Sequence, residues 1–169
     1  FSDIVVLTHE ANRGYGRTLA DAFAYADECG YDWVISLDAD EQHDPSQIQD
    51  FLRWAIRDEA DIISGSRYMK EQPSYEQVPG DRRQINYLIT VLLNKILNLP
   101  LTDSFCGFKA YRVAGLRRLR LTVPGYAFPI QFWVQVARAG LRVEEIPIKL
   151  IYHDPTRRFG GGLDDAAVR

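Results

Sequence analysis

The chain has 169 residues, of which 46% are hydrophobic and 25% charged, and its formal net charge is -3 at pH 7. This length suits one domain with a full hydrophobic core and is too short for two ordinary domains. The slightly acidic balance lacks the basic footprint of nucleic-acid-binding domains, so we expect no nucleic-acid partner. The spacing of Cys29 and Cys106 fits neither a metal site nor a disulfide framework, which predicts two buried thiols in a reducing compartment.

The first half of the chain alternates short apolar runs with amphipathic stretches. Ile4 to Leu7 is a β-branched run that predicts a buried strand. A loop over 12–16 follows it. The next predicted elements are a helix over 18–29, a strand over 33–37, a helix opened by Pro45 and Ser46, and a strand over 61–64.

The second half continues the alternation after a loop over 72–80 that is rich in Pro, Ser, Glu and Gly. The order of elements predicts an α/β fold with a mostly parallel sheet and helices on both faces. No apolar run reaches the roughly 18 residues of a membrane span. We predict one domain over 1–152 and a flexible, basic, glycine-rich tail over 153–169. The remaining predicted elements are a helix over 85–97, a turn and strand over 103–111, a helix over 130–139 and a strand over 142–151.

Two carboxylates, Asp38 and Asp40, directly follow the strand predicted over 33–37. Residues i and i+2 of an extended segment point the same way, so both side chains can face one site. Adjacent carboxylates repel unless a cation lies between them, and carboxylate oxygens suit Mg²⁺ or Mn²⁺. A solvated acidic loop with a helix N-cap is the alternative. His43 can support such a metal site, although a simple loop histidine fits the sequence better.

Arginines follow the next strand. Gly65-Ser66-Arg67 ends it, and Arg82 and Arg83 come after the loop that begins at 72. A guanidinium binds phosphate bidentately, and glycine lets the backbone approach a ligand. Ligands of α/β sheets bind at the carboxyl ends of strands, which is where Arg67 and the Asp38–Asp40 pair both lie. Each arginine alone is equally compatible with an ordinary surface position.

Two further segments carry candidate chemistry. Asp103, beside aromatic residues and a glycine, is either a general base whose pKa is raised by burial or a turn or cap residue. Arg157 and Arg158 precede three consecutive glycines. Backbone amides and arginines suit a phosphate, and glycines suit a loop that closes over it. A disordered basic tail is the alternative interpretation of that segment.

In this order, the motifs resemble family-two glycosyltransferases with the GT-A fold, within them the dolichol-phosphate mannose synthase-like branch. The resemblance spans roughly residues 4 to 152 and implies that a βα unit is missing at the N-terminus. Its landmarks are Asn-Arg-Gly-Tyr-Gly at 12–16, Leu-Asp-Ala-Asp-Glu-Gln-His-Asp-Pro at 37–45, Gly-Ser-Arg-Tyr at 65–68, Asp-Ser-Phe-Cys-Gly-Phe-Lys-Ala-Tyr at 103–111 and Ile-Pro-Ile at 146–148.

The resemblance implies roles for the candidate residues. Asp38 and Asp40 would hold Mg²⁺ or Mn²⁺ on the diphosphate of a nucleotide-sugar donor, with Gln42 beside them. Arg67 and one of the arginines at 82 and 83 would neutralise donor or acceptor phosphate, and Asp103 would lie near the sugar or the acceptor. The implied reaction is inverting transfer of a hexose, from a donor of the GDP-mannose or UDP-glucose type, to a polyprenyl phosphate.

Two other functions remain open at this point: a sugar-nucleotide nucleotidyltransferase and a non-catalytic domain that binds nucleotide sugars. A lipid acceptor would place the protein in the cytoplasm, at the cytoplasmic face of a membrane. The basic tail and the helix within Tyr87 to Leu101 are the segments from which we expect peripheral membrane contact.

Overall fold

The computed structural model describes residues 4–69 and 80–151, and within them the side chains from Arg83 onward in the second range. The loop predicted over 72–80 lies outside the described residues except for Gly80, with which α3 begins, and the tail from 153 lies outside them entirely. The elements are α1 (Tyr15–Glu28), β1 (Trp33–Ser36), the 3-10 helix η1 (Pro45–Gln47), α2 (Ile48–Ile56), β2 (Ile62–Ser66), α3 (Gly80–Leu97), β3 (Lys109–Arg112), α4 (Val113–Leu116), α5 (Phe128–Arg138) and β4 (Val143–Pro147).

The four strands form one sheet in the order β1-β3-β2-β4. β2 and β4 pair in parallel, whereas β3 runs antiparallel between β1 and β2. Three of the four strands therefore share one direction, and β3 is inserted against it. Its central position was not foreseen from the sequence, because the alternation of strands and helices does not reveal the direction of a strand that follows a turn.

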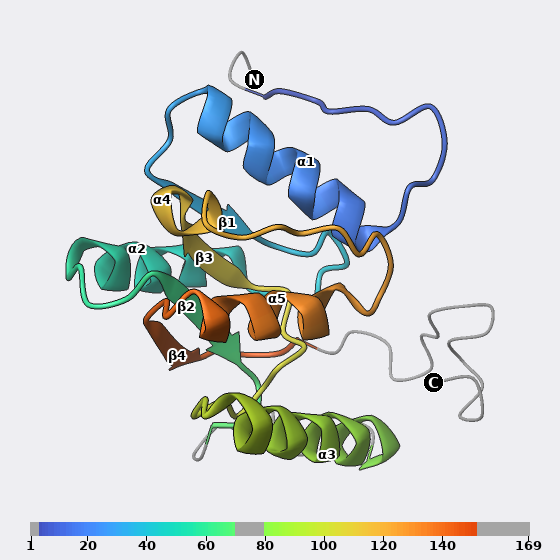
Figure 1. Ribbon diagram of the computed structural model, residues 1–169, viewed down its shortest axis with the longest axis vertical. Coiled ribbons are helices and arrows are strands. Elements are labelled where there is room, and N and C mark those ends of the chain that lie inside the picture. Colours follow the sequence, from blue (N-terminus) through green and yellow to red (C-terminus); the bar gives the residue numbers. More distant parts are fainter. Residues whose placement is uncertain (1–3, 70–79, 152–169) are drawn as a thin grey trace.

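Helices cover both faces of this sheet, as predicted (Figure 1). Ile62 points to the face that α1, α4, α5 and part of α3 cover, and Ile63 points to the face covered by α2. Both isoleucines are fully buried. This alternation is what a strand between two helical layers requires, since successive side chains point to opposite faces. The α/β class predicted from the sequence is confirmed.

The strand predicted over Ile4 to Leu7 is wrong. These residues form no strand in the structure, and their exposed fractions lie between 48% and 77%. The segment passes outside α1 rather than along β1 (Figure 1). A β-branched run becomes a strand only where a neighbouring strand accepts its hydrogen bonds and a surface covers its side chains.

The prediction of two buried thiols is correct for one cysteine and wrong for the other, because Cys106 is buried and Cys29 is exposed.

The start of α1 is fixed by close packing of two glycines against the segment before α5. The amide of Gly16 donates to the carbonyl of Pro124 at 2.8 Å. Gly14 has a φ of 89°, which favours glycine. A Cβ on Gly16 would lie 2.2 Å from the carbonyl oxygen of Val123 and 2.7 Å from Cβ of Phe128. The glycines of the motif at 12–16 therefore serve packing.

We expect Gly16→Ala to lower the free energy of unfolding by about 1–3 kcal/mol, because overpacking forces the backbone apart. Urea denaturation monitored by circular dichroism measures the change. Gly125→Ala is the matched control, since a Cβ there meets nothing within 4 Å. Equal stability of the two variants would contradict the packing role of Gly16.

Candidate functional site

One edge of the sheet collects the polar groups. The carboxyl ends of β1 and β2 lie there, and because β3 is antiparallel, its amino end lies there as well. Asp38 and Asp40 follow β1, Arg67 follows β2, and the turn 103–107 precedes β3. Segments far apart in the sequence thus reach the same edge.

The acidic pair lies where β1 gives way to a bend. Asp38 and Asp40 are both half-buried. The amide of Gln42 donates to Oδ1 of Asp40 at 3.1 Å, and Glu41 between them has a φ of 63°. Asp38 lies against Gly107, where a Cβ would come within 2.2 Å of Oδ2 of Asp38. The absent side chain of Gly107 leaves the space that the Asp38 carboxylate occupies.

His43 shows how closely the candidate groups gather. Its side chain is buried, and its backbone forms a bridge with Leu150. Burial lowers the pKa of His43, the Asp38 and Asp40 carboxylates oppose that shift, and two nearby cations add to it. Nδ1 of His43 has no hydrogen-bond partner among the described residues. The charges of both aspartates therefore act on one imidazole.

Arg67 and Asp103 form a buried ion pair with two parallel hydrogen bonds. Nε of Arg67 donates to Oδ2 of Asp103 at 2.6 Å, and Nη2 donates to Oδ1 at 2.9 Å. Asn86 of α3 and the amides of Arg67 and Phe105 also donate to this carboxylate. The Asp103 side chain is fully buried, whereas 21% of the Arg67 side chain is exposed. The guanidinium is held at the edge in one orientation.

The pKa of Asp103 is lowered, which corrects one expectation from the sequence. Burial alone would raise the pKa, but the Arg67 charge and the hydrogen bonds from Arg67 and Asn86 outweigh it and hold the pKa at about 2. A carboxylate that is ionised and accepts several hydrogen bonds does not suit a general base. A raised pKa at Asp103 was wrong, and a role of Asp103 in the reaction stays a prediction.

The inner side of α3 supplies the polar partners of this pair. Thr90 bonds Asn86 at 2.9 Å and Ser104 at 2.8 Å, and Asn94 donates to the carbonyl of Leu101 at 2.7 Å. Arg83 precedes Asn86 by three residues and so lies on the same side of the helix. The side chain of Arg82, together with Arg157 and Arg158, lies outside the described residues, so their assignment stays a prediction.

Sequence reasoning missed three residues beside the ion pair. Lys109 is buried with 4% exposure, and Asn86 is buried with 5%. Glu145 of β4 accepts hydrogen bonds from the amide and hydroxyl of Thr102 at 2.6 and 2.7 Å. The available signals were a lysine inside an apolar strand and polar residues every fourth position, at 86, 90 and 94, on an apolar helix.

The donor set fits a divalent metal only in part, as an open site. Asp38 and Asp40 supply carboxylate oxygens, which suit Mg²⁺ or Mn²⁺. Among residues 4–69 and 80–151, no group of three or more His, Cys, Asp or Glu side chains could hold a metal. A closed cage made by the described residues is therefore excluded. Two carboxylates fit the kind of site that phosphate oxygens of a ligand complete.

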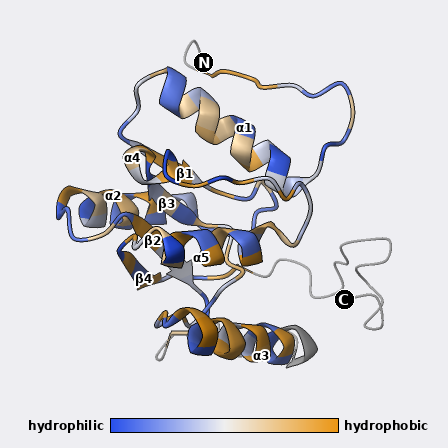
Figure 2. Ribbon diagram, viewed as in Figure 1, coloured by the Kyte–Doolittle hydropathy of each residue, from blue (hydrophilic) through white to orange (hydrophobic). Residues whose placement is uncertain are grey.

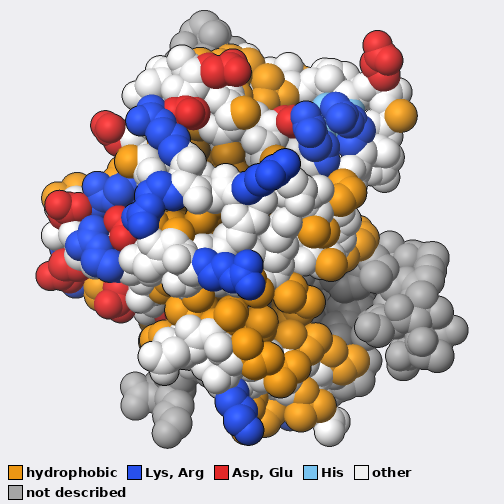
Figure 3. Space-filling model, in the orientation of Figure 1, with side chains coloured by type: hydrophobic (Ala, Val, Ile, Leu, Met, Phe, Trp, Pro, Cys, Tyr) orange, Lys and Arg blue, Asp and Glu red, His pale blue; other side chains and the backbone are white. Residues whose placement is uncertain are grey.

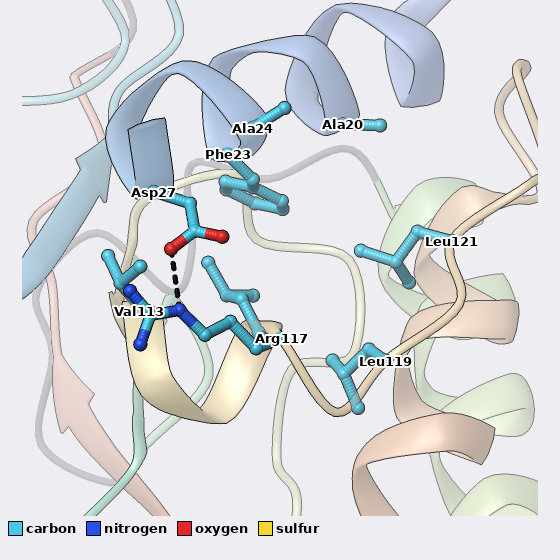
Figure 4. Close-up of a pocket in the computed structure, with 9 residues that line it drawn as sticks. Ala20, Phe23, Ala24, Asp27, Val113, Arg117, Leu119 and Leu121 are labelled. Carbon is cyan, nitrogen blue, oxygen red and sulfur yellow. Dashed lines mark hydrogen bonds and ion pairs between the residues drawn. The ribbon is translucent and has the colours of Figure 1, made fainter. Parts of the chain in front are cut away.

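A separate apolar groove of about 190 Å³ lies between α1 and the segment around α4 (Figure 4). Phe23, Leu119 and Leu121 line it, and the ion pair between Arg117 and Asp27, at 2.5 Å, lies beside it. None of the predicted site residues lines this groove. The candidate site is therefore the charged edge of the sheet rather than this hollow.

Several known proteins are similar to this chain over most of its length. A family model described as Glycosyl transferase family 2 matches residues 1–120. An undecaprenyl-phosphate mannosyltransferase of Micrococcus luteus is 32% identical over 96% of this chain and 68% of its own length. A polyprenol monophosphomannose synthase of Mycolicibacterium smegmatis is 27% identical over 86% of this chain. The chain spans 56% of that relative's length.

Among solved structures, glucosyl-3-phosphoglycerate synthase from Mycobacterium tuberculosis matches with a TM-score of 0.60 and 16% identity. The match covers 90% of this chain and 50% of that one. The same synthase was also solved with Mn²⁺ and uridine diphosphate. These neighbours confirm the GT-A fold class that the sequence predicted. Since the family model covers well over half of the chain, the chain belongs to glycosyl transferase family 2.

Proposed function

We propose that this protein transfers a hexose from a nucleotide-sugar donor to a polyprenyl phosphate, with inversion at the anomeric carbon. The observation that carries the proposal is the placement of an acidic pair and a fixed guanidinium at one edge of the sheet. Asp38 lies against Gly107 at one end of the turn 103–107, and Arg67 binds Asp103 at the other end. The relatives named after undecaprenyl phosphate and polyprenol suggest the lipid acceptor.

The roles follow from the chemistry of these groups. Asp38 and Asp40 would hold Mg²⁺ or Mn²⁺, which supplies positive charge next to the leaving diphosphate. Arg67, oriented by Asp103, presents its guanidinium to a phosphate, and Arg83 adds charge from α3. Gln42 binds the substrate beside the acidic pair. We also propose that residues 1–152 form one catalytic domain and that the basic segment 153–169 is its tail.

A phosphate acceptor explains why an ionised Asp103 suffices. The acceptor oxygen is already an anion, so it attacks the anomeric carbon without losing a proton. The bond from that carbon to the donor diphosphate breaks as the new bond to the acceptor oxygen forms. A general base with a raised pKa is not needed, which agrees with the lowered pKa of Asp103.

Calorimetric titration of GDP-mannose and UDP-glucose, with and without Mn²⁺, tests the proposal. We expect binding that requires Mn²⁺ and that Asp40→Ala weakens by about 10-fold or more, because a ligand to the metal is lost. Asp44→Ala is the matched control, since Asp44 accepts from the amide of Ser46 as the N-cap of η1. Metal-independent binding, or equal binding by Asp40→Ala, would overturn the metal role. Binding without release of nucleoside diphosphate would favour the non-catalytic alternative.

We also propose that α3 contacts the surface of a membrane, at the cytoplasmic face. Large apolar side chains are exposed on this helix. Figure 2 shows that much of the helix is hydrophobic, and Figure 3 shows hydrophobic side chains at the surface over it. No described helix is long and apolar enough to cross a membrane. A helix of this kind lies in the interface with its apolar side buried. The exposed residues are Tyr87, Leu88, Val91, Leu92 and Ile96, with fractions from 46% to 68%.

A further inference from the structure

We propose that Lys109 is a positioning residue that holds the turn 103–107 and thereby places both Asp38 and Arg67. The inference rests on the proposed function for the meaning of those two groups. It goes beyond that function because it identifies one buried support for the metal-binding side and the phosphate-binding side together.

Lys109 contacts the turn 103–107 from its buried side. Its ammonium donates to the carbonyl of Cys106 and lies 5.4 Å from the centre of the Trp133 ring. Nε1 of Trp133 donates to the carbonyl of Ser104 at 2.8 Å. Lys109 of β3 and Trp133 of α5 therefore donate hydrogen bonds to two carbonyl groups of one short turn.

The two ends of this turn touch the two charged groups of the site. At one end, Asp103 binds Arg67 through both carboxylate oxygens. At the other end, Gly107 provides the space for the Asp38 carboxylate, and its carbonyl accepts from Oγ of Ser36 at 2.5 Å. A shift of the turn would therefore displace Asp38 and Arg67 at once.

A direct role in binding substrate does not fit Lys109. Its side chain is only 4% exposed, and it is engaged by the carbonyl of Cys106. Burying an ammonium is costly, and an apolar side chain of the same size would be cheaper for stability alone. Its position under the turn gives that charge a purpose, which is to orient carbonyls that no apolar side chain can bind.

The experiment compares Lys109→Met, Lys109→Arg and Gly107→Ala, with Lys149→Met as the control for removing an exposed lysine. The first readout is affinity for Mn²⁺ with GDP. The second is hydrogen exchange at the amides of Ser104 and Phe105, which bond to Thr90 and Asp103. We expect Lys109→Met to weaken Mn²⁺–GDP binding by about 10- to 100-fold, as loss of a residue that orients metal ligands does. Both amides should exchange faster, and Lys109→Arg should restore both readouts in part.

Gly107→Ala separates the two ends of the turn. Its new Cβ should force the Asp38 carboxylate to rotate, so Mn²⁺ affinity should fall while exchange at Phe105 stays as in the wild type. Wild-type binding and unchanged exchange in Lys109→Met would overturn the proposal. Should Lys109→Met fail to fold, unchanged Mn²⁺ affinity in Gly107→Ala would overturn it instead. If the wild type binds no Mn²⁺–GDP, the proposed function fails, and exchange in Lys109→Met still decides whether Lys109 holds the turn.

Discussion

Asp103→Ala should lower the free energy of unfolding by about 3–5 kcal/mol, because it leaves the Arg67 guanidinium without its counter-charge. The Asp103 side chain has no exposed surface and accepts two hydrogen bonds from the Arg67 side chain. The variant would also leave Nδ2 of Asn86 without its hydrogen-bond acceptor. In the wild type, Nδ2 donates to the Asp103 carboxylate at 2.8 Å. Urea unfolding at pH 7 measures the loss.

A double variant separates stability from function in this pair. Replacing both partners, as Arg67→Met with Asp103→Leu, should recover part of the lost stability, since the unpaired charge is removed. The recovery is incomplete because Asn86 and the amides of Arg67 and Phe105 still lose their acceptor. The double variant should still fail to bind phosphate-bearing ligands, because the guanidinium is gone. A loss below about 1 kcal/mol in Asp103→Ala would mean that the pair behaves as an exposed one.

The same pair predicts a dependence of stability on pH. The pKa of Asp103 is about 2 in the folded protein and lies below the usual value of 3.8. A lowered pKa contributes stability above the unfolded-state value, and that stability is lost as the pH falls toward the folded-state value. The contribution is therefore complete above a pH of about 4 and disappears toward a pH of about 2. Urea midpoints of the wild type and Asp103→Asn should converge over this range.

Leu92→Glu combined with Ile96→Glu should weaken binding to lipid vesicles by about 30-fold or more. Burial of one such side chain contributes about 1.5–3 kcal/mol, and roughly half of each remains to be buried in the free protein. The exposed fractions of Leu92 and Ile96 are 55% and 68%. Co-sedimentation with vesicles of phosphatidylglycerol and phosphatidylcholine measures the change.

The control for α3 carries the same chemical change elsewhere. Val6 and Ile56 are exposed by 77% and 84% and lie outside α3. Val6→Glu combined with Ile56→Glu should bind vesicles as the wild type does. Equal weakening in both double variants would point to charge rather than to the outer side of α3. Absence of vesicle binding by the wild type would remove the membrane proposal.

The sequence predicted the elements where periodicity and neighbours agree. The helix at 18–29 matches α1, and the strands at 33–37 and 61–64 match β1 and β2 within a few residues. Asp38 and Arg67 reach one edge because both follow strands that run the same way. The strand-end rule was therefore enough to predict that these two candidate residues lie at one edge of the sheet.

The remainder depended on contacts between distant segments. Nothing in the sequence near Asp103 shows that Arg67 lies beside it, so burial alone suggested a raised pKa. In the sequence, Lys109 is only a charged residue within a predicted strand. Its contacts with Cys106 and Trp133 become visible in the structure alone. Ile4 to Leu7 has the composition of a strand, but pairing is a property of two segments, and one segment cannot predict it.

The antiparallel strand β3 also sets the distance between β1 and β2, the two strands that pair with it. Adjacent strands lie about 4.8 Å apart, so β1 and β2, on either side of β3, are separated by about 10 Å. Asp38 and Arg67 thus follow strands that lie two spacings apart, and the Asp38 carboxylate lies against Gly107, which precedes the strand between them. Under the proposed function, we therefore expect a diphosphate, whose charge extends along its length, to bind more tightly at this edge than a single small anion.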